Sequence, residues 1–208
     1  MQTSSARKNI LKKIKQALAK PVPLPFEVSS RTDFFVNDKT ELELQFAESF
    51  SALQGRFSFC ISEKEMAEQL QTLFNTRKWN KVFTSENSLA EMLKQYELQT
   101  TSTNLAECDA AITTCEYLIA RSGSIVVSSL QNGRTPGVYA PVHICVAYTN
   151  QLVFDIDDSI KLLQQKYSSN LPSMISFTSG PSRTADIEKT LVTGVHGPKE
   201  LFCFLVQS

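Results

Sequence analysis

From about residue 38 onward, segments with the hydrophobic spacing of a helix alternate with segments that have the pattern of a strand. Four segments space their apolar residues at helical intervals: residues 38–55, 63–77, 86–98 and 155–167. Gly55 ends the first predicted helix, and Asn87 or Ser88 is a candidate cap for the third. Extended segments lie between the helical ones, an order typical of βαβ units.

The extended segments are short and cover residues 56–62, 81–85, 110–115, 123–129, 142–148, 174–179 and 200–207. Four of them, residues 110–115, 123–129, 142–148 and 174–179, are β-branched and apolar on both faces. Strands that are apolar on both faces are typical of a sheet with helices on both sides. The sequence therefore predicts a three-layer α/β domain over residues 38–208, with a mostly parallel sheet and helices on both faces.

The N-terminus has a separate amphipathic pattern. Its apolar residues recur at helical spacing between lysines and are Ile10, Leu11, Ile14 and Leu18. A Pro-rich stretch follows, so we expect a helical arm over residues 1–20 and a stiff linker over residues 21–37. The apolar stripe can dock on its own domain or on a neighbouring subunit, which leaves a homo-oligomer open. The basic face also suits a membrane surface.

The charge balance narrows the classes of partner. The chain has 208 residues, with 21 Lys and Arg against 21 Asp and Glu, so neither nucleic acid nor an acidic lipid surface is an expected partner. Apolar runs such as SIVVSSL are far shorter than the roughly 20 residues of a membrane span. The N-terminus lacks the continuous apolar region of a secretory leader, so we expect a cytoplasmic protein.

The cysteines are scattered among apolar neighbours and contain no CxxC pair. They are Cys60, Cys108, Cys115, Cys145 and Cys203. This pattern favours buried free thiols in a reducing compartment. The chain supplies neither the clustered thiolates of an iron–sulfur or zinc site nor a GxGxxG nicotinamide motif, so the cofactor stays unknown.

A polar stretch after the predicted strand 174–179 is the first candidate site. Gly180 and Pro181 turn the chain, and we expect Ser182, Arg183 and Thr184 to start a helix or a helical turn. A helix N-terminus beyond the carboxyl end of a strand binds anions, and an arginine can pair with a carboxylate or phosphate in a bidentate manner. The segment therefore predicts a small anionic ligand. The alternative is an ordinary helix cap.

The following residues strengthen this candidate, because Gly194 and Gly197 bracket one of only two histidines in the chain. The predicted ligand-binding residues here are Gly180, Ser182, Arg183, Thr184, Asp186, His196, Gly197 and Lys199. Asp186, Glu188 and His196 are also residue types that suit a divalent ion, but their spacing matches no HExxH pair, so we expect no metal. The second histidine, His143, lies inside an apolar strand and is interpreted as a core residue.

Three long motifs carry a resemblance to a known family: GPSRTADIEKTLVTGVHGPKELFCFLV, EYLIARSGSIVVSS and GRTPGVYAPVHICV. They resemble the C-terminal signature and middle segments of the LUD domain family, whose best-known members form the lactate-utilization protein C group. The resemblance covers roughly residues 40–208. The family usually carries Thr-Gly-Thr after an acidic residue, whereas this chain has Ser122, Gly123 and Ser124 after Arg121. The resemblance adds Gly123 and Ser124 as ligand-binding candidates.

The resemblance implies the NagB/RpiA/CoA-transferase-like fold, shared by sugar-phosphate isomerases and CoA transferases. It also implies a place in bacterial oxidation of L-lactate to pyruvate, beside two partners that resemble iron–sulfur oxidoreductase components. On this hypothesis the chain is an auxiliary or ligand-binding subunit, and any clusters belong to the partners.

The second hypothesis is a stand-alone enzyme of the acyl-transfer or ligase type, acting on a small carboxylate or a nucleotide-like substrate. Candidate catalytic residues are Glu116, Asp186, Glu188 and His196. Glu116 follows the end of a predicted strand, from which its side chain can enter a cleft. The alternative for Glu116 is an exposed carboxylate in the first turn of a short helix.

Overall fold

The computed structural model describes residues 5–18, 41–101, 103–131, 133, 135–184, 192–194 and 197–208. The chain divides into two compact units, residues 1–38 and 39–208. In the first unit, α1 (Ser5–Leu18) is the helix expected at the N-terminus, and Ile10 and Leu11 are exposed on it. The predicted linker, residues 21–37, lies outside the described residues.

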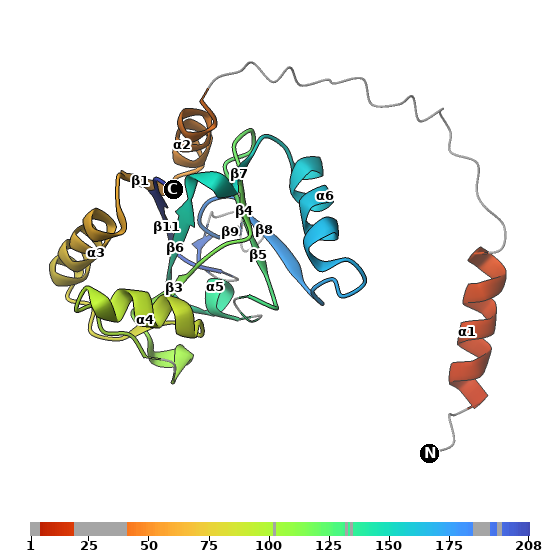
Figure 1. Cartoon of the computed structure of the whole chain (residues 1–208). Helices are drawn as coiled ribbons and strands as arrows, with labels where there is room; N and C mark the ends of the chain where they lie inside the picture. Colours follow the sequence, from red (N-terminus) through yellow and green to blue (C-terminus); the bar gives the residue numbers. More distant parts are fainter. Residues whose placement is uncertain are drawn as a thin grey trace. The chain divides into compact units, whose positions relative to one another are not determined.

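A five-stranded parallel sheet forms the centre of the second unit (Figure 1). Its strands, in spatial order, are β1 (Arg56–Cys60), β11 (Glu200–Val206), β6 (Val142–Tyr148), β3 (Ala110–Thr113) and β2 (Val82–Phe83). All four pairings are parallel. The predicted α/β class, with a parallel sheet flanked by helices, is confirmed.

A second sheet of four strands packs on one face of the first. Its order is β7 (Leu152–Val153), β4 (Tyr117–Ile119), β5 (Ser124–Ser128) and β8 (Ile175–Thr178). The β4–β5 and β5–β8 pairs are antiparallel, whereas β4 pairs with β7 in parallel. The sequence predicted the strands of β5 and β8 but not their separate sheet, because a strand covered by another sheet is as apolar on both faces as one covered by helices.

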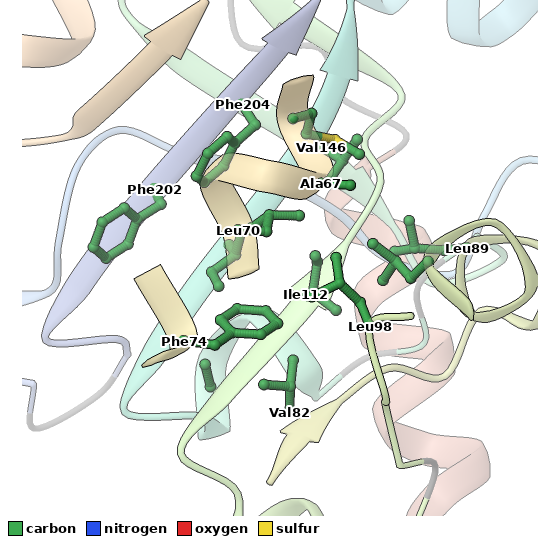
Figure 2. Packing of buried hydrophobic residues seen from close by; sticks show 14 of the residues in the cluster. Ala67, Leu70, Phe74, Val82, Leu89, Leu98, Ile112, Val146, Phe202 and Phe204 are labelled. Atoms are coloured by element: carbon green, nitrogen blue, oxygen red, sulfur yellow. The ribbon is translucent and has the colours of Figure 1, made fainter. Parts of the chain in front are cut away.

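Helices α3 (Glu63–Arg77) and α4 (Asn87–Gln95) cover the opposite face of the parallel sheet. Leu70 and Phe74 of α3 pack there beside Ile112, Val146 and Phe204 of the strands (Figure 2). Both helices lie within their predicted ranges. The cap of α4 was predicted wrongly, since its N-cap residue is Glu86, one position before the two candidates.

Two further helices of the second unit, α2 and α6, lie on the side of the second sheet. Phe46 and Phe50 of α2 (Leu42–Ala52) join the core between the two sheets, and α6 (Ile156–Tyr167) packs on the outer face of the second sheet. Short elements complete the unit: η1 (Leu105–Glu107), α5 (Pro136–Tyr139), η2 (Thr149–Gln151), β9 (Arg183–Thr184) and β10 (Val192–Thr193). All five cysteines are free and buried, as the sequence predicted.

Two glycines let the loops of the second sheet press directly on α2. A Cβ atom on Gly123, whose φ is 58°, would lie 2.5 Å from the backbone nitrogen of Phe50. Gly180, with a φ of 80°, lies equally tightly against the carbonyl oxygen of Leu53 at the end of α2. Both positions combine a left-handed backbone with a close approach, and only glycine tolerates the two together.

We expect Gly123→Ala to lower the free energy of unfolding by about 3 kcal/mol, because it adds a clash with α2 to the strain of a positive φ. Gly133→Ala is the matched control: Gly133 has a φ of 75°, but its nearest neighbour would lie 3.8 Å from the new Cβ. Urea denaturation should show a loss of only about 1 kcal/mol for the control. Equal losses in the two variants would contradict a close packing role for Gly123.

Candidate functional site

The segment predicted as an anion site does not start a helix at Ser182. Arg183 and Thr184 form β9, which pairs with β10 in an antiparallel ribbon through Thr184 opposite Val192. The N–H of Ser182 donates to the carbonyl oxygen of Pro198 at 2.9 Å. The expected helix start is therefore wrong, and an anion here would have to be bound by side chains rather than by a helix N-terminus at these residues.

The structure does bring the two glycine-rich stretches of this segment together. The N–H of Gly194 donates to the carbonyl oxygen of Ser182 at 3.1 Å, and a Cβ atom on Gly197 would lie 2.9 Å from that of Ser182. Gly194 also lies against the side chain of Lys199. The backbone N–H of Lys199 donates to the carbonyl oxygen of Pro141 at 2.8 Å. Asp186, Glu188 and His196, which were predicted in the same site, lie outside the described residues.

Two cations of this segment that the structure describes, Arg183 and Lys199, are both exposed. Nη2 of Arg183 donates to the carbonyl oxygen of Leu53 at 2.9 Å, at the carboxyl end of α2, where a positive charge is favoured. A guanidinium has five N–H donors, so this single bond leaves others that can meet an anion. The side chain of Arg183 is thus oriented by the scaffold while its charge stays accessible.

The loop between β4 and β5 joins the same region through serine hydroxyls. Ser124 is buried, and its Oγ lies 2.7 Å from Oγ of Ser122 and 2.6 Å from Oγ of Ser179. Ser179 directly precedes Gly180, so the loop and the glycine-rich segment are linked. Arg121, which stands at the family's acidic position, pairs with Asp155 at 2.7 Å. The reversed charge is therefore balanced within the chain, at the cap of α6.

Glu116 is neither exposed nor helical, in contrast to one of the two expectations for it. It precedes β4, is 3% exposed and accepts hydrogen bonds from Ser128 Oγ at 2.5 Å, Tyr167 Oη at 2.6 Å and Lys166 Nζ at 2.7 Å. Burial works against ionisation, but the bonds from Lys166, Ser128 and Tyr167 outweigh it and hold the pKa of the carboxyl below its ordinary value. Glu116 therefore fastens α6 to the second sheet.

A pocket between the two sheets was not predicted. It is small and partly open to solvent, and it is bordered on one side by Gly133, Gly137 and Val138, at and before α5. Its other walls are formed by Thr113, Val127, His143, Met174, Ser176 and Thr178. The sequence signal was the alternation of hydroxyl and apolar residues along β8, which gives one face of that strand a polar lining.

His143 lies at the bottom of this pocket. The interpretation of His143 as a buried residue of an apolar strand holds, since it is 1% exposed, but its ring also lines the pocket. Its Nε2 lies 2.8 Å from Oγ1 of Thr113. Burial lowers the pKa of the imidazole from 6.5 to about 4, so the ring is neutral near neutral pH.

Within the described part of the chain, no three His, Cys, Asp or Glu side chains are placed to hold a metal ion. The same part of the chain contains no helix that is both long and apolar enough to cross a membrane.

Comparison with known proteins identifies relatives of the chain. The sequence profile of the LUD domain matches residues 77–206. The chain is 26% identical to an uncharacterized protein of Neisseria meningitidis serogroup B, over 95% of this chain and 91% of that protein. Identity to lactate utilization protein C of Shouchella clausii is 28%, over 86% of this chain and 74% of that protein.

The lactate utilization protein C of Halalkalibacterium halodurans is 38% identical, but over 48% of this chain and 44% of that protein. Among solved structures, a DUF162 family protein from Deinococcus radiodurans has a similar fold, with a TM-score of 0.60 and 17% identity. The match covers 80% of this chain and 96% of that one, so the architecture extends over nearly the whole relative.

We expect His143 to make the protein sensitive to acid. Its folded pKa of about 4 lies below the ordinary value of 6.5, so the stability of the neutral buried ring is present above that value and is lost as the pH falls toward 4. Relative to a His143→Gln variant, which does not titrate there, the parent should lose about 3 kcal/mol of unfolding free energy between about pH 7 and pH 4. Denaturant unfolding at several pH values measures this difference. A pH-independent difference would show that the ring is not held neutral.

Proposed function

The chain belongs to the LUD domain family, and from this premise we propose that it acts in lactate utilisation as a subunit that binds a small anionic ligand. Relatives named lactate utilization protein C support the role in lactate utilisation. The ligand is a small carboxylate, with L-lactate and pyruvate as the first candidates, or a phosphate.

One observation carries the ligand proposal: Ser182 contacts both Gly194 and Gly197. This contact brings together the chain segments that carry the exposed cations Arg183 and Lys199. A carboxylate bound by a charged donor gains about 1.5–3 kcal/mol per hydrogen bond. Gly123 and Ser124 support this segment through Ser179, and Asp186 and His196 lie in the same stretch of sequence.

Electron transfer in this proposal belongs to iron–sulfur partner proteins. The thiols of this chain are buried in the core and free, which supports a reducing compartment such as the cytoplasm. The alternative of an acyl-transfer enzyme with Glu116 as nucleophile or base is disfavoured, because three donors already bind that carboxylate and its pKa is lowered.

Arg183→Ala should raise the Kd for the preferred ligand among L-lactate, pyruvate and phosphate by about tenfold, since it removes a charged donor. Isothermal titration calorimetry measures the Kd, and growth on L-lactate of a deletion strain complemented with the variant tests the role in the cell. Lys161→Ala, which removes an exposed lysine on α6, is the control and should bind and grow like the parent. Parent-like binding by Arg183→Ala would refute the anion site.

The purified chain alone should not reduce a dye with L-lactate as the electron donor, because the proposed redox groups belong to its partners. Adding the partner proteins should restore lactate-dependent reduction, and Arg183→Ala should slow it. Dye absorbance measures the rate. Lactate-dependent reduction by the isolated chain would overturn the proposal of an auxiliary subunit. It would not decide whether the anion site exists, which the calorimetry tests separately.

A further inference from the structure

The pocket between the two sheets contains a buried polar atom without a bonding partner. Nε2 of His143 lies 2.8 Å from Oγ1 of Thr113, which fixes the orientation of the ring. Nδ1, on the other side of the ring, has no hydrogen-bond partner among the described residues, although the residue is 99% buried. An unpaired buried polar group costs about 1–3 kcal/mol, so this nitrogen would gain from a partner inside the pocket.

Gly137 lies directly against the ring of His143 beside this nitrogen. A Cβ atom at this position would lie 3.2 Å from Cε1 and 3.4 Å from Nδ1 of His143. Gly137 does not adopt a left-handed φ, so its backbone conformation does not require glycine. Alanine is also the better helix former in α5. The close approach of the imidazole to this Cα therefore explains the glycine.

The residues that line the pocket indicate which kind of ligand it can bind. The described lining residues carry three hydroxyl groups, on Thr113, Ser176 and Thr178, together with apolar side chains and the neutral ring of His143. None of them carries a charge near neutral pH, and burying an unpaired charge in such a place is strongly unfavourable. The pocket therefore suits a molecule that is uncharged and forms hydrogen bonds.

We propose that this pocket is a second binding site, distinct from the anion segment, for a small uncharged alcohol or amide that hydrogen-bonds to Nδ1 of His143. The Thr113 hydroxyl can either donate to Nε2 or accept from it, so Nδ1 is correspondingly a donor or an acceptor. Alcohols and amides offer both functions and fit either tautomer. The hydroxyls of Ser176 and Thr178 lie on the wall formed by β8, where they can bond the remaining polar atoms.

The test uses the full chain with 15N-labelled histidine and L-lactamide as the uncharged probe. The chain has two histidines, so its imidazole 15N signals can be assigned with the His143→Gln and His196→Gln variants. L-lactamide should shift the Nδ1 signal of His143 in a saturable way and leave His196 unchanged. L-lactate, which differs by its carboxylate, should not shift His143. A shift of His196 alone, no shift at all, or an equal response of His143 to L-lactate would overturn the proposal.

Two variants test whether the 15N shift of His143 reports binding of L-lactamide in the pocket. Gly137→Ala places a methyl group 3.4 Å from Nδ1, where it crowds the ring, and should raise the Kd for L-lactamide by about tenfold. Thr178→Val, a nearly isosteric change on the wall, should raise it by about threefold and serves if the first variant does not fold. Tyr139→Ala, on the same short helix as Gly137 but 69% exposed, is the control and should bind like the parent. Parent-like binding of L-lactamide by a folded pocket variant would refute this site. The proposal of an anion site would be unaffected by that result.

Discussion

The chain crosses from the parallel sheet to the second sheet within residues 113–116, and each of these residues is held by a different neighbour. Thr113 bonds His143, and Thr114 donates both its N–H and its hydroxyl to Glu86. Cys115 is buried between the sheets, and the carboxylate of Glu116 accepts from Lys166 on α6. Since these four residues touch both sheets, α4 and α6, they connect the layers of the unit beside the pocket.

This crossing explains why the elements could be predicted from sequence but their grouping could not. The spacing of apolar residues located α2, α3 and α6, because helical periodicity can be recognised within one short stretch of sequence. Strand β4 is only three residues long and follows β3 almost at once, which left no local signal for a change of sheet. Assignment of β5 to a second sheet depends on its antiparallel partners, which lie in distant parts of the sequence.

The candidate sites, too, could be predicted only as far as they depend on local sequence. Ser182 and Thr184 have good capping side chains, so the local sequence favours a helix, but the pairing of Thr184 with Val192 makes the segment a strand. Ser182 and Gly197, which contact each other, could be assigned to one candidate site because both lie in one polar, glycine-rich stretch of sequence. His143 could be recognised as buried but not as part of a pocket, since Thr178 on β8 reaches it only through the packing of one sheet on the other.

The cost of burying charge argues for keeping the two proposed ligands apart. Glu116 shows what a buried carboxylate requires in this fold: a cation and two hydroxyl donors within 2.7 Å. The described walls around His143 offer hydroxyls, which suit the hydrogen-bonding groups of an uncharged molecule. Arg183 and Lys199 are exposed, so an anion bound beside them keeps part of its hydration and needs fewer protein donors. An anionic substrate is therefore expected at the surface segment, and an uncharged molecule in the pocket.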